Sequence, residues 1–356
     1  MQDEELKYWI AFTYLYRNSV PKQKEFLAAY HTIDEVWAHV TEEGKKEAEK
    51  KAARELEFIH KHGIQVLAPT DAAYSNRLKE CVDAPTLIYT KGKVNFNEGK
   101  FLSVVGTRSA TEQGKDITRQ IILDLAHKVP NLTIVSGLAY GIDVAAHKAA
   151  LEAGLPTIAV LGHGLDRIYP TVHRSVAIEI LKNGGLVTEY PSEIEPDGWN
   201  FVARDRIIAG LSNATLVVES KARGGSLITA GQALDYNRDV FAIPGRIWDV
   251  NSAGCNQLIR DQRAMLVTNA DDIVSAMQWE SVPVQTQLDL ADVDETLEPL
   301  ALRILQYMHE EEADVHINQL VMAMEAEYQE VVTQLIYLEM QGYIRTLAGG
   351  YYHLTK

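Results

Sequence analysis

The stretch FLSVVGTRSATEQG, Phe101 to Gly114, joins a strand pattern to a glycine turn that departs from a known fingerprint. The apolar run Phe101 to Val105 predicts a buried strand, and Gly106 follows it directly, as in a dinucleotide-binding turn. In the G-x-G-x-x-G fingerprint the second glycine lets the backbone touch a pyrophosphate, but Arg108 takes that place in this chain. We therefore expect the turn to meet backbone phosphates through a guanidinium, at side-chain distance.

Similar apolar runs recur from about residue 66 to 275, with helical stretches between them. The runs are FLSVVG, LTIVSG, PTIAVLG, GLVTEY, ATLVVES, DVFAIPG and AMLVTN. Apolar strands without alternation, spaced by helices, are typical of a parallel sheet covered on both faces. The sequence thus predicts a doubly wound α/β domain whose ligand binds at the carboxyl ends of the strands.

The regions on either side of this domain have different patterns. Residues 1–65 are helical, and EEGKKEAEKKAARELEFIHKHG has strong helix formers with Gly63 as the expected stop. This charge run is most simply a solvated helix face, and a small helical DNA-binding fold is the alternative. Residues 276–297 are polar and acidic and predict a linker. Residues 298–356 predict three helices and two short strands, a winged-helix arrangement.

The bulk composition is that of an ordinary soluble protein, with 46% hydrophobic and 23% charged residues among 356. The amino terminus MQDEELKYWI lacks the basic-then-apolar order of a signal peptide, and no apolar run approaches the ~20 residues needed to span a bilayer. Cys81 and Cys255 give neither a disulfide framework nor metal-ligand spacing. We expect a cytoplasmic protein with two buried free thiols and no membrane partner.

The net charge of -15 is unevenly distributed along the chain. Residues 1–100 hold 15 basic and 16 acidic side chains, residues 101–270 hold 16 and 17, and residues 271–356 hold 3 and 16. The last segment therefore carries 13 of the 15 excess negative charges. Because the middle of the chain is nearly neutral, a basic cleft for nucleic acid is compatible with the acidic total.

Glycines gather where the predicted strands end. In SGLAYGIDVAAH, Ser136, Gly137 and Gly141 precede a helix expected to begin near Ile142. Such a helix start offers amide N–H groups and the positive end of a dipole to an anion. Glycines that only permit a tight turn are the alternative. In VLGHGLDRIYP, His163 has no convincingly paired nucleophile, which favours a structural role over catalysis.

The segment NFVARDRIIAGLSN places an aromatic residue beside two arginines. Phe201, Arg204 and Ile208 fall on one helical face, and Arg206 lies about 200° round from Arg204. One arginine is thus expected to reach a ligand while the other faces a neighbouring element. An aromatic ring can stack a base while cations hold its phosphates, although a single Phe is more often part of a core.

The segment KARGGSLITAG predicts a second anion site. Lys221 and Arg223 precede Gly224 and Gly225, and Ser226 is a suitable N-cap for the following helix. The chain has no G-x-x-x-x-G-K-[ST], no complete G-x-G-x-x-G and no carboxylate cluster with metal spacing. These strand ends therefore favour the successive phosphates of a single strand over one nucleotide, with no cofactor and no metal.

Taken in order, these segments resemble the DprA/Smf family, DNA-processing proteins of bacterial transformation. The matching motifs are DAPTLIYTKG (83–92), VVGTR (104–108), SGLAYGID (136–143), AVLGHGLDRIYP (159–170), TEYP (188–191), RDRIIAGLS (204–212), ESKARGGSLITA (219–230), VFAIPG (240–245) and GCNQLI (254–259). They span about residues 70 to 265, and the winged-helix pattern also fits. The combination is very specific, although each piece alone is weak.

The resemblance implies an extended Rossmann domain that binds single-stranded DNA, forms a homodimer and hands the DNA to a RecA-type recombinase. By motif, Arg108 would be a principal phosphate contact and Phe201 a base-stacking residue, while Lys221, Ser226 and Thr229 would belong to the second anion loop. The candidate DNA-binding residues are Gly106, Arg108, Ser136, Gly137, Gly141, Phe201, Arg204, Arg206, Lys221, Gly225, Ser226 and Thr229.

Two positions depart from the family pattern. RDRIIAGLS carries Asp205 where relatives usually have Asn, which places a negative charge between two proposed cations. Thr171 stands where some relatives have a lysine after the YP of the third strand loop. Both differences bear on the affinity for DNA.

Two other functions compete with this prediction. A Rossmann-like nucleotide hydrolase resembling the lysine-decarboxylase-like phosphoribohydrolases would carry P-G-G-x-G-T-x-x-E, whereas KARGGSLITAG lacks that glutamate and Glu219 precedes the loop. A winged-helix transcription factor would bind duplex DNA, yet its candidate recognition helix, Tyr328 to Gln341, contains no Lys or Arg. We expect no catalytic residues, and an acidic winged-helix module that contacts protein.

Overall fold

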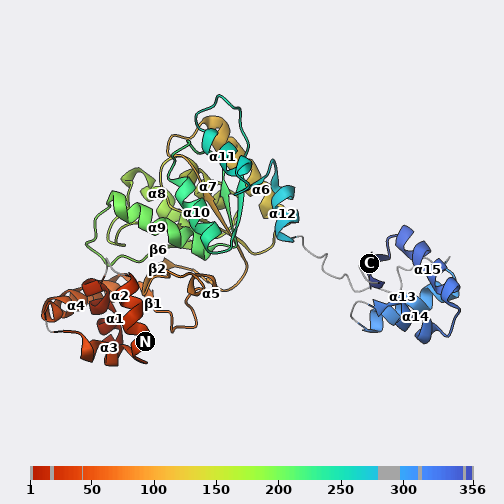
Figure 1. The fold of residues 1–356 in the computed structure, drawn as a ribbon, viewed down its shortest axis with the longest axis horizontal. Coiled ribbons are helices and arrows are strands. Elements are labelled where there is room, and N and C mark those ends of the chain that lie inside the picture. The colour runs from red at the N-terminus through yellow and green to blue at the C-terminus, as the bar shows by residue number, and fades with distance from the viewer. Residues whose placement is uncertain are drawn as a thin grey trace. The chain divides into compact units, whose positions relative to one another are not determined.

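The computed structural model of the protein describes residues 3–16, 20–41, 43–279, 297–311, 315–347 and 350–354. The chain divides into two compact units, Met1–Glu280 and Ser281–Lys356 (Figure 1). Residues 280–296, which make up most of the predicted linker, lie outside the described residues.

A nine-stranded sheet forms the centre of the first unit, in the order β1-β2-β6-β5-β4-β3-β7-β8-β9. The strands are β1 (Gln65–Leu67), β2 (Ile88–Gly92), β3 (Lys100–Val105), β4 (Leu132–Ser136), β5 (Thr157–Val160), β6 (Gly184–Thr188), β7 (Ala214–Val217), β8 (Asp239–Ala242) and β9 (Met265–Leu266). The strands from β6 to β9 pair in parallel, whereas β1 and β2 form an antiparallel edge that the apolar runs did not predict. The predicted doubly wound, mostly parallel sheet is confirmed.

Helices cover both faces of this sheet (Figure 1). They are α5 (Asn76–Lys79), α6 (Glu112–Lys128), α7 (Ile142–Glu152), α8 (Arg174–Ile180), α9 (Gly198–Leu211), α10 (Ser226–Asp235), α11 (Ala253–Arg260) and α12 (Ala270–Met277), with a 3₁₀ turn η1 (Thr171–His173). In β3, Phe101 and Val105 enter the core shared with α9 and α10, whereas Leu102 and Val104 enter the core shared with α6 and α7. Burial on both faces explains why β3 is apolar at nearly every position.

Four helices precede the sheet: α1 (Asp3–Tyr16), α2 (Val20–Ala29), α3 (Ile33–His39) and α4 (Lys45–His62). The charged helix α4 ends at Gly63 with φ 60°, as the sequence predicted, and buries Ala52 and Ile59 on its inner face. The core of these helices also contains Tyr89 of β2. They therefore pack on the antiparallel edge and belong to the same compact unit as the sheet.

The first unit extends beyond residue 275, where the sequence placed its end. α12 ends at Met277, and Trp279 is buried in the core beneath α6 and α7. The carbonyl oxygen of Trp279 accepts a hydrogen bond from Lys100 Nζ at 3.2 Å. A single buried tryptophan gives no periodic signal from which the sequence could place the end of this unit.

The second unit has the order expected of a winged helix. Its elements are α13 (Pro299–Glu311), β10 (Val315–His316), α14 (Ile317–Met324), α15 (Tyr328–Met340), β11 (Ile344–Leu347) and β12 (Tyr351–Leu354). β11 and β12 pair antiparallel, and β10 joins the far side of β12. Leu335 and Leu338 of α15 are buried in the unit's own core, so the predicted winged-helix arrangement is confirmed.

The two cysteines are buried free thiols, as predicted. Burial raises the pKa of Cys81 to about 11 and that of Cys255 to about 12, which keeps both thiols protonated. No helix among the described residues has the length and apolar character that a membrane crossing requires.

Candidate nucleic-acid interface

The carboxyl ends of β3, β4 and β7 open onto a pocket of about 330 Å³, which we call the strand-end pocket. The start of α9 forms another wall. Eight of the twelve predicted residues line this pocket: Gly106, Arg108, Phe201, Arg204, Lys221, Gly225, Ser226 and Thr229. Segments up to about 120 residues apart in sequence thus meet where the topology of a doubly wound sheet places its ligand.

Two glycines fix the turn that carries the exposed side chain of Arg108. Gly106 packs against Ile142, where a Cβ atom would lie 2.8 Å from the Ile142 Cβ. Gly141 has φ 78°, and a Cβ atom there would overlap the Thr107 carbonyl oxygen and lie 2.8 Å from the Arg108 carbonyl carbon. Close packing therefore requires glycine at both positions and presses the turn against the start of α7.

The ring of Phe201 lines the pocket and contacts both a cation and a second ring. The guanidinium carbon of Arg108 is 5.4 Å from the ring centre, within the range of a cation–π contact. Tyr169 stacks on Phe201 with 5.6 Å between ring centres and 24° between ring planes. Phe201 is half-buried and belongs to neither of the two cores beside the sheet. The alternative considered from the sequence, that Phe201 is a core residue, is therefore wrong.

Sequence reasoning missed Tyr169. It stands before Pro170 in GLDRIYP, in the loop after β5, and no periodicity links it to Phe201 on α9. Tyr169 is 46% exposed. An aromatic residue in a strand-end loop was the available signal, because such loops carry the ligand contacts of this fold.

Arg204 lies beneath the pocket in a network of buried polar groups. Its Nη1 donates to the carbonyl oxygens of Gly137, at 2.8 Å, and Val160, and its Nε donates to Asp205 at 3.0 Å. Asp143 accepts a hydrogen bond from the Gly137 amide at 3.2 Å, and burial raises its pKa to about 6 although Arg204 opposes the shift. The negative charge of Asp205, which departs from the family pattern, is therefore balanced by Arg204 inside the protein.

The loop before α10 presents the second set of cations. Lys221 and Arg223 are exposed, and neither has an ion-pair partner within the described part of the chain. Gly225 borders open space, with nothing within 4 Å of a Cβ atom built there. The predicted N-cap role of Ser226 is wrong: Gly225 is the N-cap, and the Ser226 hydroxyl donates to Ser220 Oγ at 2.9 Å.

Besides Gly141, three predicted residues do not line the pocket. Ser136 is fully buried, and its hydroxyl donates to the Val104 carbonyl oxygen at 2.7 Å. Gly137 leaves room for the buried guanidinium of Arg204. Arg206 points to the other side of α9, pairs with Glu189 and lines a separate pocket. Arg204 and Arg206 point in opposite directions, as the helical spacing predicted. However, the guanidinium groups of both arginines bond to groups of the protein itself.

Two other side chains considered for catalysis lie outside the strand-end pocket. The carboxylate of Glu219 accepts hydrogen bonds from the amide of Thr111 at 2.9 Å and from its hydroxyl at 2.5 Å, at the start of α6. His163 is buried, its Nδ1 lies 2.8 Å from the Gly164 carbonyl oxygen, and burial lowers its pKa. Glu219 and His163 therefore make structural contacts within the protein.

Comparison with known proteins gives concordant matches to the sequence. The family model of DNA recombination-mediator protein A matches residues 65–278, and that of the DprA winged helix domain matches residues 289–350. Protein Smf of Escherichia coli is 38% identical over 298 residues, which cover 82% of this chain and 78% of that protein.

Two solved structures are similar to much of this chain. The DNA processing protein A of Streptococcus pneumoniae superposes with a TM-score of 0.64 and 34% identity over 77% of this chain and 98% of its own. That of Helicobacter pylori, described for its single-stranded DNA binding mode, gives a TM-score of 0.54 and 27% identity over 60% and 95%. The sheet, the strand-end pocket and the match over more than half of the sequence agree, and the chain belongs to the DNA recombination-mediator protein A (DprA/Smf) family.

Proposed function

We propose that this protein binds single-stranded DNA through the strand-end pocket, without strong sequence preference. The observation that carries the proposal is the position of the exposed Arg108 over the ring of Phe201. A single strand presents unstacked bases beside regularly spaced phosphates, and an aromatic ring with adjacent cations binds both. Bases in a duplex are already stacked on each other, so the ring would gain nothing from a duplex.

The charges around the pocket support the same ligand. Arg108, Lys221 and Arg223 are exposed and face solvent, whereas Asp205 is offset by the buried Arg204. Cations on two loops can hold successive phosphates of one strand. The Helicobacter pylori relative, described for its single-stranded DNA binding mode, adds support from within the family.

We further propose that the protein protects the bound strand, loads a RecA-type recombinase onto it and acts as a homodimer through the α/β unit. The family's description as a recombination mediator supports the loading role. Exposed apolar side chains of Met265 and Leu266 on the last strand of the sheet, β9, support self-association.

The test of DNA binding compares one labelled sequence as a single strand and as a duplex, by fluorescence anisotropy with the full chain. The single strand should bind more tightly at every salt concentration, and its affinity should fall steeply with salt as counterions are released. Equal or tighter binding of the duplex would contradict the proposal. For loading, recombinase assembly on a strand coated with single-strand-binding protein should accelerate; an unchanged rate would leave DNA binding standing and remove the mediator role.

A nucleotide hydrolase is the second candidate, favoured by one observation. Asp143 lines the pocket with a pKa raised to about 6, and shifts of this kind gather at catalytic sites. However, this carboxylate is buried and already accepts a hydrogen bond from the Gly137 amide. Incubation with nucleoside monophosphates separates the two functions, because a hydrolase would release free base and the proposed DNA-binding protein would not.

A further inference from the structure

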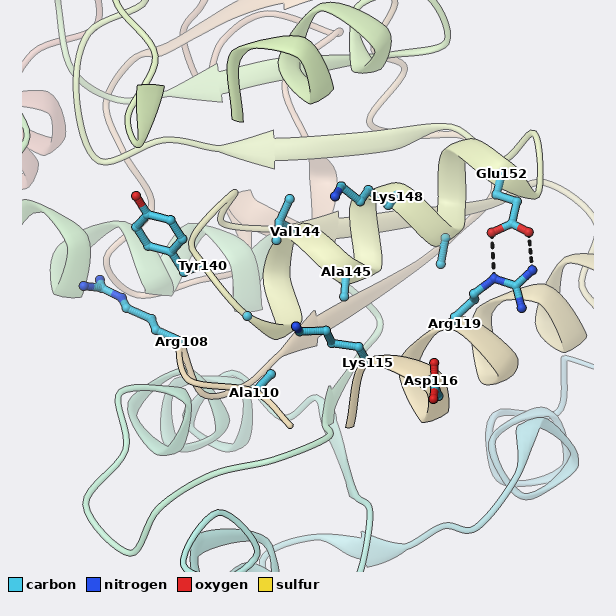
Figure 2. Close-up of a pocket in the computed structure, with 12 residues that line it drawn as sticks. Arg108, Ala110, Lys115, Asp116, Arg119, Tyr140, Val144, Ala145, Lys148 and Glu152 are labelled. Carbon is cyan, nitrogen blue, oxygen red and sulfur yellow. Dashed lines mark hydrogen bonds and ion pairs between the residues drawn. The ribbon is translucent and has the colours of Figure 1, made fainter. Parts of the chain in front are cut away.

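A second cavity, of about 520 Å³, lies between α6 and α7, and we call it the α6–α7 groove. Its charged and aromatic lining residues are Arg108, Lys115, Asp116, Arg119, Tyr140, Lys148 and Glu152. Figure 2 shows Arg108 and Tyr140 at one end of the groove and the paired Arg119 and Glu152 at the other. Nothing in the sequence patterns singled out this surface.

The groove is a neighbour of the strand-end pocket, because Arg108 lines both cavities. Gly141 also lines the groove, and its close packing holds the Arg108 turn against the start of α7. A ligand that contacts Arg108 in the strand-end pocket is therefore held next to the groove.

The available charge in the groove is positive. Arg119 and Glu152 neutralise each other through a two-pronged ion pair, with 2.8 Å between Nε and Oε2. Lys115 pairs with Glu112 at 2.6 Å, but water screens so exposed a pair and a phosphate can compete for the lysine. Asp116 is the remaining carboxylate of the lining.

Lys148 is a cation of the groove that is available to contact a ligand. It is exposed on α7, and among the described residues it has neither an ion pair nor a side-chain hydrogen bond. An uncommitted ammonium group beside a shared arginine is suited to the next backbone phosphate of a strand.

Tyr140 supplies an aromatic surface beside Arg108. Tyr140 is 49% exposed, and the edge-to-face contact of its ring with His173, at 5.1 Å between ring centres, supports the ring from one side. An exposed ring that is supported from one side is suited to stack a base, as Phe201 is in the strand-end pocket.

We propose that the α6–α7 groove binds the continuation of the single strand whose first segment lies in the strand-end pocket. Tyr140 stacks a base, Lys148 and Lys115 contact phosphates, and Arg108 joins the two segments. The inference rests on the proposed function, because it takes the occupant of the strand-end pocket to be single-stranded DNA.

The test uses oligothymidylates of about six and about fifteen nucleotides, which lie near the two ends of the range of lengths that single-strand sites cover. In the full chain, the double variant Tyr140→Ala/Lys148→Glu should weaken binding of the longer strand at least about fivefold, the lower limit for one stacked base. The short strand should lose less than about twofold. For Lys148→Glu alone, the salt dependence of the longer strand should fall by about 0.7 in log–log slope, one phosphate contact.

The matched control is Lys93→Glu, the same charge change on an exposed lysine next to the amino end of β6, away from both cavities. It should leave both affinities unchanged. Unchanged binding of the longer strand by the double variant, or an equal loss for both strands, would overturn the groove as a separate segment. If Arg108→Glu leaves both affinities at the wild-type level, the proposed function fails instead, and the two failures are thereby distinguished.

Discussion

The guanidinium carbon of Arg108 lies 5.4 Å from the centre of the Phe201 ring, although one residue follows β3 and the other belongs to α9. A glycine in place of Arg108 would let the backbone approach a pyrophosphate, as in dinucleotide-binding turns. In the function proposed above, the arginine instead places a cation where the phosphates of a strand meet its bases. The same position of the fold would then bind an extended strand in place of a dinucleotide.

Removal of the ring should cost base stacking and leave the phosphate contacts in place. Phe201→Ala should weaken single-strand binding by about 1–3 kcal/mol, with an unchanged slope of log affinity against log salt. Trp199→Ala is the matched control, because Trp199 is an exposed aromatic residue on the same helix that lines the separate pocket of Arg206. Both variants are compared by anisotropy. Equal losses for the two, or none for Phe201→Ala, would remove Phe201 from the site.

Substitution by alanine should destabilise the protein more at Gly141 than at Gly154, a glycine of similar φ. Gly141 and Gly154 have φ of 78° and 71°, but nothing lies within 4 Å of a Cβ atom at Gly154. Gly154→Ala should lower the free energy of unfolding by about 1–2 kcal/mol, because a side chain is strained at positive φ. Gly141→Ala should cost more and weaken DNA binding, because the methyl group pushes the Arg108 turn. Urea unfolding and anisotropy measure both effects, and identical behaviour of the two variants would contradict the packing argument.

His147 is a buried base whose protonation state follows from its partners. Its Nδ1 lies 2.8 Å from Thr157 Oγ1, and the Thr157 hydroxyl donates to the Ile134 carbonyl oxygen at 2.9 Å. Because that hydroxyl proton is already used, His147 Nδ1 must be the donor, and its buried Nε2 is unprotonated. Burial lowers the pKa of His147 to about 3.

This depressed pKa makes the free energy of unfolding fall in acid. Between pH 6.5 and about 3 the unfolded state takes up a proton that the folded state does not, so stability falls as the pH falls. His147→Asn removes this titration. The loss of unfolding free energy between pH 7 and pH 4.5 should then shrink by about 2–3 kcal/mol in urea titrations. An equal loss of unfolding free energy in wild type and variant would contradict the inference that the buried His147 is neutral.

The winged-helix unit should not contribute to single-strand binding. Its candidate recognition helix α15 has Glu330 and Glu339 and no Lys or Arg, and Arg303 is occupied by the Met324 carbonyl oxygen at 3.0 Å. A surface of this charge repels DNA over the ~8–10 Å Debye length of physiological salt and suits a basic protein partner. Truncation after Glu280, which keeps Trp279 in its core, should leave the affinity unchanged or slightly raised. A tenfold loss in a folded truncation of unchanged oligomeric state would contradict this.

The fold was predictable where burial is periodic or continuous. β3 is apolar at nearly every position because each face contacts a helix layer, and α4 shows its period in Ala52 and Ile59. The three-residue strand β1 and the buried Trp279 were missed, since isolated burial leaves no repeating pattern.

The candidate site was predictable in its location and only partly in its geometry. The strand-end rule selected Arg108, Phe201 and Lys221, which do line one pocket. Helical spacing gave the opposite directions of Arg204 and Arg206 but not their burial, because Arg204 is held by carbonyl oxygens of distant segments and Arg206 by the carboxylate of Glu189. The position of Tyr169 in a strand-end loop was a signal for a ligand contact, but no periodicity indicated that its ring stacks on Phe201.

The most direct test of the central claim is a salt titration of single-strand binding by wild type, Arg108→Glu and the control Lys93→Glu. Both substitutions change an exposed cation to a carboxylate, but only Arg108 lies in the pocket. Arg108→Glu should bind more than tenfold more weakly, a loss above ~1.4 kcal/mol, with a shallower salt dependence, while Lys93→Glu matches wild type. Wild-type affinity and slope in a folded Arg108→Glu variant would contradict the account.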